Sequence, residues 1–314
     1  MGDILSIILP VFVLVGTGYL LVRMKIFGLA VADGLTVFAT KVAVPCLLFG
    51  AVASLDIGSV YTANLFLTFF VSAAICFGCG VGGARLFFQR TPMDAVSIGF
   101  ASLFSNAFLL GIPIMERAFG PESLAPNFAI ISVHLLFCYT LGTISMEMAR
   151  AGVGHLGQTA LSVGRTMAKS PMVIAALLGF AVNLSGLTLP YLIQQPIKLL
   201  AGAALPVALF GMGGLFNKWS LRRSVRAAGM VTMISTLIHP FLVLLLGTSI
   251  FPLSPAFLAS AIVTAAMPTG INAYLFAANY DRATGASASA VLLATAISMV
   301  TISGWLWFLK SQIL

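Results

Sequence analysis

The stretch Phe104-Ser105-Asn106-Ala107-Phe108-Leu109-Leu110-Gly111-Ile112-Pro113 lies within a long apolar segment, yet it carries an amide, a glycine and a proline. Lipid offers no water to a broken helix, so a break is tolerated only where protein buries it or where it lines a wet cavity. A second interrupted segment, Met267-Pro268-Thr269-Gly270-Ile271-Asn272-Ala273-Tyr274, lies near the other end of the chain. Two such segments, one in each half, favour a transporter-type binding site, although Pro and Gly are also simply common in membrane helices.

The composition excludes an ordinary soluble protein. Of the 314 residues, 60% are hydrophobic and 8% are charged, whereas soluble domains have roughly a quarter charged residues. The first apolar run, 4–22, has no basic leader and no clear cleavage site, and is interpreted as a membrane helix rather than a signal peptide. The four cysteines lie in apolar runs, and no histidine or second pair supports Cys76 and Cys79 as a metal site. We expect an all-α polytopic membrane protein without metal or cofactor.

Ten apolar segments can each cross a bilayer core, which needs about 20 helical residues. They are 4–22, 33–53, 62–88, 94–115, 126–148, 171–187, 191–215, 224–250, 255–279 and 284–309. Of the 16 Lys and Arg residues, twelve fall in the connections after odd-numbered segments, three fall on the other side, and Lys41 falls inside a segment. The positive-inside rule places the odd connections in the cytoplasm and both termini outside. The net charge of +8 therefore reflects topology and not nucleic-acid binding.

One sequence offset relates the two halves of the chain. A shift of 161 residues takes Pro10 to Pro171, Gly18 to Gly179, and the run Pro45-Cys46-Leu47-Leu48-Phe49-Gly50 to Pro206-Val207-Ala208-Leu209-Phe210-Gly211. Each repeat has five spans, and because five is odd, the repeats insert in opposite orientations. We predict two inverted five-helix repeats, residues 1–152 and 165–314, with the substrate near the midplane between them.

The candidate site residues follow from the two breaks. Breaks near Gly111–Pro113 and Pro268–Gly270 would leave half-helix ends with unpaired N–H groups and partial positive charge, which suit an anion. Asn106 and Asn272 each flank a break and can both donate and accept hydrogen bonds. The alternative for these two amides is a helix–helix contact without a binding role.

Few ionisable residues fall within the spans. Lys41 is costly at membrane depth and is a site candidate, although it could also snorkel to the cytoplasmic end of its helix. His134 can titrate near neutrality or serve as a core residue, and His239 is the weaker candidate. No Asp or Glu lies clearly mid-span, which disfavours a carboxylate proton relay or a carboxylate-rich sodium site.

The run Gly111-Ile112-Pro113-Ile114-Met115-Glu116-Arg117-Ala118-Phe119-Gly120 resembles the auxin efflux carrier family. This family includes plant PIN-type carriers and bacterial malonate and malate permeases. The run Pro268-Thr269-Gly270-Ile271-Asn272-Ala273-Tyr274-Leu275-Phe276-Ala277, with Tyr280, is similar to the family's ninth helix. The resemblance covers the full ten-helix length.

This resemblance implies an elevator-type fold. Helices 1, 2, 6 and 7 would form a scaffold, helices 3–5 and 8–10 would form a moving transport domain, and helices 4 and 9 would cross at their broken prolines. Asn106 corresponds to a substrate-contacting asparagine, His134 stands at the place of a helix-5 asparagine, and Lys41 matches a cytoplasm-side support site. Plant members dimerise through the scaffold side, so the resemblance also implies a homodimer.

We therefore expect a secondary transporter of a small organic anion, a carboxylate such as malonate or malate, in a bacterial inner membrane. The residues expected to bind the substrate are Asn106, His134, Asn272 and Lys41. Proton coupling ranks ahead of sodium, and uncoupled movement stays open. The rivals are a sodium-coupled anion symporter, a channel, and an intramembrane enzyme. The enzyme is disfavoured because no H-E-x-x-H, G-x-S-x-G or D-x-x-x-D pattern is present.

Overall fold

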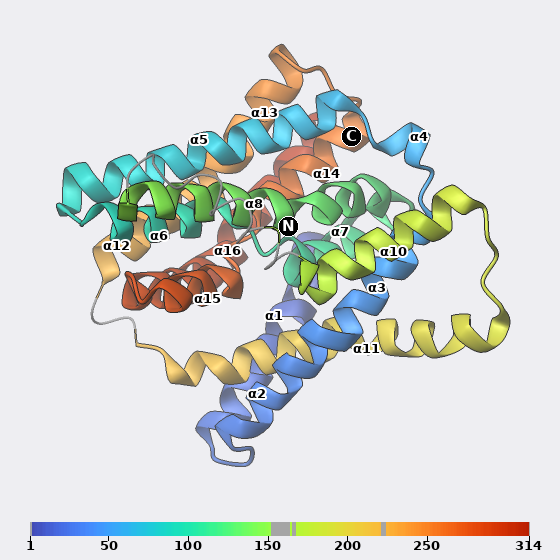
Figure 1. Cartoon of the computed structure of the whole chain (residues 1–314), viewed down its shortest axis with the longest axis horizontal. Helices are drawn as coiled ribbons and strands as arrows, with labels where there is room; N and C mark the ends of the chain where they lie inside the picture. Colours follow the sequence, from blue (N-terminus) through green and yellow to red (C-terminus); the bar gives the residue numbers. More distant parts are fainter. Residues whose placement is uncertain (1, 152–163, 165–167, 221–223, 314) are drawn as a thin grey trace.

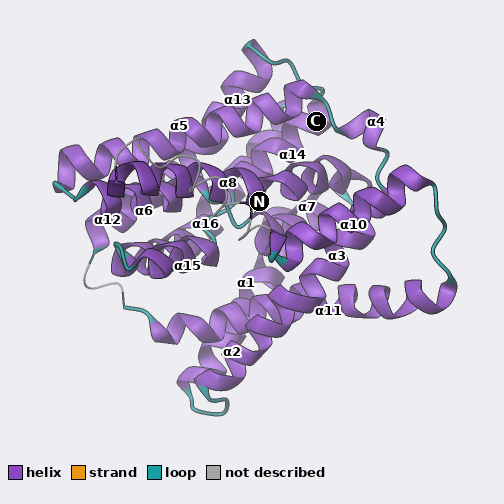
Figure 2. Ribbon diagram, in the orientation of Figure 1, coloured by secondary structure: helices purple, strands orange, loops and turns teal. Residues whose placement is uncertain are grey.

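The computed structural model describes residues 2–151, 164, 168–220 and 224–313, and within these residues every regular element is a helix (Figure 2). Seven helical stretches in this part are long and apolar enough to cross a membrane. They are 4–23, 29–54, 63–88, 121–150, 191–218, 225–249 and 284–312. They coincide with seven of the ten predicted segments, and they confirm the class of a polytopic, all-helical membrane protein.

Figure 1 labels the helices in chain order. The first half contains α1 (Gly2–Arg23), α2 (Leu29–Phe38), η1 (Ala39–Ala43), α3 (Val44–Ser54), α4 (Ile57–Val60), α5 (Ala63–Phe88), α6 (Pro92–Leu103), η2 (Ala107–Gly111), α7 (Ile112–Phe119), η3 (Pro121–Leu124) and α8 (Ala125–Ala151). The second half contains α10 (Pro171–Ser185), α11 (Tyr191–Leu215), η5 (Phe216–Lys218), α12 (Val225–Met233), η7 (Ile234–Ile238), α13 (His239–Ser249), α14 (Pro255–Ala266), α15 (Ile271–Tyr280) and α16 (Thr284–Gln312).

Three predicted segments differ from simple spanning helices. The sixth is α10, which has 15 residues. The fourth and the ninth are each divided into two short helices, α6 with η2–α7 and α14 with α15. The ten-helix inverted repeat therefore stays a prediction.

Three prolines follow directly on wide π-helical turns. In η1, η2 and η7 the last N–H before the proline bonds to the carbonyl five residues back: Val44 to Ala39, Ile112 to Ala107, and His239 to Ile234. A proline has no N–H and its ring clashes with the carbonyl four residues earlier in a regular α-helix. The extra residue in the turn lets the helix pass through Pro45, Pro113 and Pro240 without breaking.

This geometry corrects one expectation. A break near Gly111–Pro113 was expected, yet both residues lie in the continuous helix formed by η2 and α7. The break of this segment lies earlier, at Phe104–Asn106, between the end of α6 and the start of η2. The π turn explains the difference, because it accommodates Pro113 within the helix.

The two broken segments cross and pair through their backbones. Ser105 and Thr269 form an isolated antiparallel bridge. Asn106 donates its backbone N–H to the Pro268 carbonyl at 2.8 Å, and Gly270 donates to the Phe104 carbonyl at 3.0 Å. The Thr269 hydroxyl donates a hydrogen bond of 2.9 Å to the carbonyl of Ala101, which lies near the end of α6. Each break thus satisfies backbone groups that the other break leaves free, as a buried irregular segment in lipid requires.

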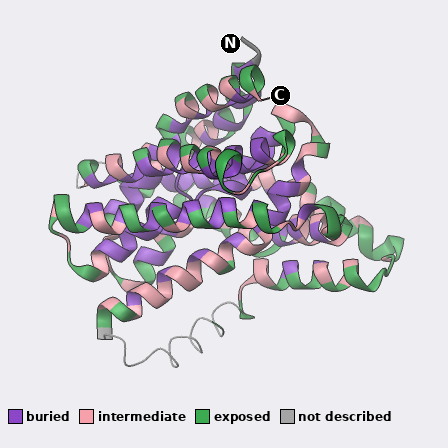
Figure 3. Cartoon of the chain, turned by 90° about the horizontal axis from the view of Figure 1, so that it is seen from above, coloured by how far each residue is buried: buried purple, intermediate pink, exposed green. Residues whose placement is uncertain are grey.

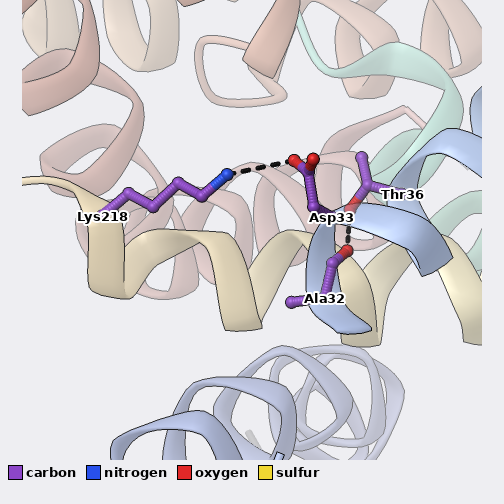
Figure 4. A network of polar contacts seen from close by, with 4 residues as sticks. All are labelled: Ala32, Asp33, Thr36 and Lys218. Atoms are coloured by element: carbon purple, nitrogen blue, oxygen red, sulfur yellow. Dashed lines mark hydrogen bonds and ion pairs between the residues drawn. The ribbon is translucent and has the colours of Figure 1, made fainter. Parts of the chain in front are cut away.

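The helices pack in two groups around this crossing (Figure 1). In one group α11 packs on α1, α2 and α3, and α10 packs on α3. In the other group α5 packs on α6 and α13, α8 packs on α6, and α12 packs on α16. An exposed ion pair between Lys218 Nζ and Asp33 Oδ1, 3.0 Å long, joins the end of η5 to α2 within the first group (Figure 4). Such a pair contributes at most about 1 kcal/mol, so helix packing and not this pair holds the group together.

Glycines set the closest approaches in the first group. A Cβ at Gly18 would collide with the Phe210 carbonyl oxygen of α11. A Cβ at Gly179 of α10 would lie 3.0 Å from the Phe49 carbonyl oxygen of α3. Both contacts are helix–helix approaches of the kind that small residues permit in membranes.

Gly18→Ala tests this packing. We expect it to lower the stability of the detergent-solubilised protein by about 1–3 kcal/mol, because the backbones must move apart. The matched control on the same helix is Gly16→Ala, where a Cβ has open space and where alanine favours the helix by about 0.5–1 kcal/mol. Thermal unfolding measures both variants, and equal midpoints would contradict the close-approach argument.

Thr269→Val tests the crossing. It removes a buried hydroxyl that bonds Ala101, so we expect a loss of about 1 kcal/mol in unfolding free energy. Thr301→Val is the control, because the buried Thr301 hydroxyl has no partner among residues 2–151, 168–220 and 224–313, and its removal should cost nothing. If the Thr301 variant were the less stable of the two, the assigned role of Thr269 would be wrong.

Candidate functional site

A small cavity of about 60 Å³ lies beside the crossing. Its walls come from the first break and η2, from the start of α15, from α8, and from η1, α3 and α10 of the other helix group. The polar side chains among its lining residues are Thr40, Ser105, Asn106, His134 and Asn272. The cavity therefore lies at the junction of the two helix groups and of the two breaks.

Two helices begin at this cavity. The helix formed by η2 and α7 starts at Ala107, and α15 starts at Ile271; both starting residues line the cavity. Neither start is capped by a side-chain hydrogen bond. The first N–H groups of a helix carry partial positive charge and bind anions when no side chain occupies them. Two such ends at one cavity make it suited to a negatively charged ligand.

The two asparagines at the cavity have different partners. Asn106 is 6% exposed, and its amide Nδ2 donates to the sulfur of Met212 at 3.5 Å. Asn272 Oδ1 accepts a hydrogen bond from the Tyr139 hydroxyl at 3.5 Å. This bond occupies the carbonyl side of Asn272, which leaves its two amide N–H groups for a ligand.

His134 and Ser105 place unpaired polar atoms at the same cavity. His134 is 4% exposed and Ser105 is 2% exposed. Within the part of the chain that the structure describes, the His134 Nε2 atom and the Ser105 Oγ atom have no hydrogen-bond partner. The imidazole packs against the rings of Phe104 and Phe69, with centroids 4.9 and 5.7 Å away. A buried polar group without a partner costs about 1–3 kcal/mol, so these two atoms can accept water or a ligand in the cavity as a partner.

The structure brings together Asn106, His134 and Asn272, and it places the other candidates elsewhere. Lys41 is exposed on η1 and does not line the cavity, although its neighbour Thr40 does. Gly111 lies inside the helix, where a Cβ would lie 3.3 Å from the Met267 side chain of the second break. Pro113 is buried in α7 and does not take part in the crossing.

The second break contains the remaining two candidates. Pro268 supplies the carbonyl that accepts from the Asn106 backbone. A Cβ at Gly270 would lie 3.2 Å from the Phe104 ring and 3.4 Å from Asn106 Cα. Gly270 therefore allows the two chain segments to lie in contact at the crossing.

Sequence reasoning missed Ser105, Thr40 and Met212. Ser105 stands next to Asn106 in an interrupted segment, and this position in the sequence could have identified it as a site residue. Thr40 lies in the π turn η1 and Met212 lies in α11, both within apolar segments, and nothing in the chain distinguishes them before the packing is known. Among the described residues, no three His, Cys, Asp or Glu side chains gather as metal ligands.

Comparison with known proteins agrees with this geometry. A family model described as "Membrane transport protein" matches residues 3–306. A Rhizobium meliloti protein named "Putative malonate transporter" is 26% identical over 99% of this chain and 97% of its own length. An "Uncharacterized transporter" of Methanothermobacter thermautotrophicus is 27% identical over 95% and 96%, and the "Uncharacterized transporter YfdV" of Escherichia coli is 21% identical over 96% of both chains. The family and these relatives are transporters and not enzymes. This chain belongs to the membrane transport protein family, which is that of the auxin efflux carriers.

Proposed function

We propose that this protein is a secondary transporter of a small organic anion, a carboxylate of the malonate or malate type. The observation that carries the proposal is the cavity at the crossing, where two uncapped helix starts meet Asn106, Asn272, Ser105 and His134. Helix N–H groups and amide N–H groups all donate to carboxylate oxygens. The name of the Rhizobium relative supports malonate as the first anion to test.

The size of the cavity supports an alternating-access mechanism. At about 60 Å³ it holds only a few water molecules, whereas pockets for small molecules are typically about 300–1,000 Å³. The site must therefore widen to admit a dicarboxylate. Thr40, Val44 and Met172 line it from one helix group, while Asn106 and His134 line it from the other side. Elevator-like movement of one group against the other would open and close it.

Packing within the first helix group supports the inverted repeat and its domains, 1–152 and 165–314. Gly18 packs against Phe210, and Gly179 packs against Phe49. The 161-residue offset exchanges these two pairs. An inverted repeat produces such an exchange, because its pseudo-two-fold axis maps each half onto the other. The scaffold would then be α1, α2, α3, α10 and α11, the side through which a homodimer would form.

The orientation follows from the basic residues. The start of α1 and the end of α16 lie at the same end of the molecule (Figure 3), as an even number of crossings requires. In the assignment made from the sequence, twelve of the 16 Lys and Arg residues fall in the connections of the other side. By the positive-inside rule that side is cytoplasmic, so both termini would lie outside a bacterial inner membrane.

A proton is the coupling ion that the site favours. Among the described residues, no Lys, Arg, Asp or Glu lines the cavity, and a buried carboxylate is costly without a positive partner. His134 can supply that charge by binding a proton together with the anion. Its titratable neighbours are His239 beyond the Phe69 ring and, along α8, Cys138 and Tyr139. Sodium would need carboxylates or backbone carbonyls, and the first are absent from the cavity lining.

Uptake of malonate into proteoliposomes tests the anion site. Asn106→Ala removes an N–H donor to a charged ligand, an interaction of about 1.5–3 kcal/mol, so we expect KM to rise about tenfold or more. Asn64→Ala is the matched control, because Asn64 is exposed, does not line the cavity and donates its amide to the Pro252 carbonyl. Uptake of malate, pyruvate and a neutral solute is measured in the same way. Each solute is tested with and without a sodium gradient.

The outcomes of this experiment are distinct. Wild-type KM for every tested carboxylate in Asn106→Ala would remove Asn106 from the site. Accumulation driven by sodium and not by protons would support the sodium-coupled alternative. Flux that does not saturate and shows no counterflow would point to a channel.

The pH dependence of uptake tests proton coupling. If protonated His134 accompanies the anion, wild-type affinity should rise as the pH falls from 8 to 5.5, and an inward proton gradient should drive accumulation. His134→Gln keeps a polar side chain without a titratable group, so its affinity should not change with pH. His239→Gln is the control, since His239 is buried beside Phe69 and does not line the cavity. Loss of the pH dependence in the His239 variant alone would assign the proton to that residue.

A further inference from the structure

We propose that Met212 is a latch for the substrate-binding amide of Asn106. Its thioether holds the Asn106 N–H group in the substrate-free protein and releases it when a carboxylate binds. This inference rests on the proposed anion site at Asn106. It concerns a residue of α11 that does not line the cavity.

The contact between the two residues is fully enclosed. Met212 has an exposed fraction of 0% and Asn106 of 6%. Asn106 Nδ2 lies 3.5 Å from Met212 Sδ, and within the described residues this sulfur is the acceptor that the amide has. A thioether is a weak acceptor. One of the two N–H groups of the amide is therefore satisfied, but by a partner that a stronger acceptor can displace.

The surrounding sequence fixes the position of the sulfur. Met212 stands within Gly211-Met212-Gly213-Gly214, near the end of α11. A Cβ at Gly211 would lie 2.7 Å from the Thr36 hydroxyl of α2, and a Cβ at Gly213 would collide with the Val15 carbonyl of α1. The glycines on both sides of Met212 thus let α1 and α2 pack directly on the α11 backbone. The helix that carries the sulfur is held on two faces, and Met212 reaches the crossing from a third.

The strengths of the two alternative bonds make the contact a latch. A hydrogen bond to a carboxylate is shorter and roughly twice as strong as one between neutral groups, so a substrate carboxylate can take the amide from the sulfur. Without Met212, a buried N–H group would have no partner in the substrate-free state. Any interaction that stabilises this state lowers the apparent affinity for substrate, and any change that destabilises it raises the affinity. Met212 therefore sets the affinity without touching the substrate.

The contact also joins the two helix groups. Met212 belongs to the group of α1, α2, α3, α10 and α11, whereas Asn106 belongs to the crossing, where α6 ends. Loss of the sulfur contact on carboxylate binding would remove one link between the groups at the moment when the loaded site has to move.

Two substitutions at Met212 give opposite predictions for malonate binding. Met212→Leu keeps the volume and removes the acceptor, so the Asn106 amide is unpaired until malonate binds, and we expect Kd to fall about fivefold. Met212→Gln supplies a carbonyl acceptor stronger than sulfur, and we expect Kd to rise about fivefold. Met146→Leu is the control, since Met146 is equally buried on α8 and does not contact Asn106 through a hydrogen bond. Malonate binding to purified full-length protein measures all variants.

A double variant separates the latch from packing. In the Asn106→Ala background, Met212→Leu should leave the affinity unchanged, because the amide that the sulfur holds is gone. If the leucine variant does not fold, norleucine at position 212 removes the sulfur at nearly constant shape and carries the same prediction. Thermal unfolding confirms that each variant tested is folded.

The failures are distinguishable. Equal weakening of binding by Met212→Leu and Met212→Gln would make Met212 a packing residue and overturn the latch. Wild-type affinity in both variants, with binding still weakened by Asn106→Ala, would also overturn it while the anion site stands. If Asn106→Ala bound malonate as the wild type does, the proposed site itself would be wrong, and the latch with it.

Discussion

The structure depends on the exchange of backbone hydrogen bonds between Phe104–Asn106 and Pro268–Gly270. An interrupted helix in lipid exposes N–H and C=O groups that nothing else can satisfy. Because each break supplies the partners of the other, both can lie at the centre of the molecule. This pairing places two helix starts at the cavity. It also sets the positions of Asn106 and Asn272 beside the junction of the two helix groups.

The sequence predicts the class of the fold well, because long apolar segments and the asymmetry of Lys and Arg are direct consequences of a bilayer. It predicts the second break, which the structure has at 267–270. It misplaces the first break, because proline usually interrupts a helix, whereas the π turn before Pro113 accommodates it. Which carbonyl meets which N–H across about 160 residues depends on tertiary packing, which no local pattern encodes.

For the candidate site too, the sequence identifies some residues, and only the packing reveals the others. Asn106, His134 and Asn272 are polar residues in apolar surroundings, so composition alone makes them conspicuous, and the structure places them at one cavity. Lys41 is equally conspicuous, yet the helix turns it to the exterior, where a long amphipathic side chain is tolerated. Met212, by contrast, is inconspicuous in the sequence but contacts a site residue in the structure. A buried methionine is usually only core packing, and its contact with Asn106 becomes visible only when α11 is placed against the crossing.

The paired breaks have a consequence for biogenesis. The segment that holds Asn106 is synthesised about 160 residues before the segment that holds Pro268. Until the second arrives, the backbone of the first has no native partner inside the membrane. During synthesis the backbone of the first break therefore needs other hydrogen-bond partners, such as water or lipid headgroups. Neither break can complete its own hydrogen bonding, so the crossing forms only after residues 267–270 have been synthesised.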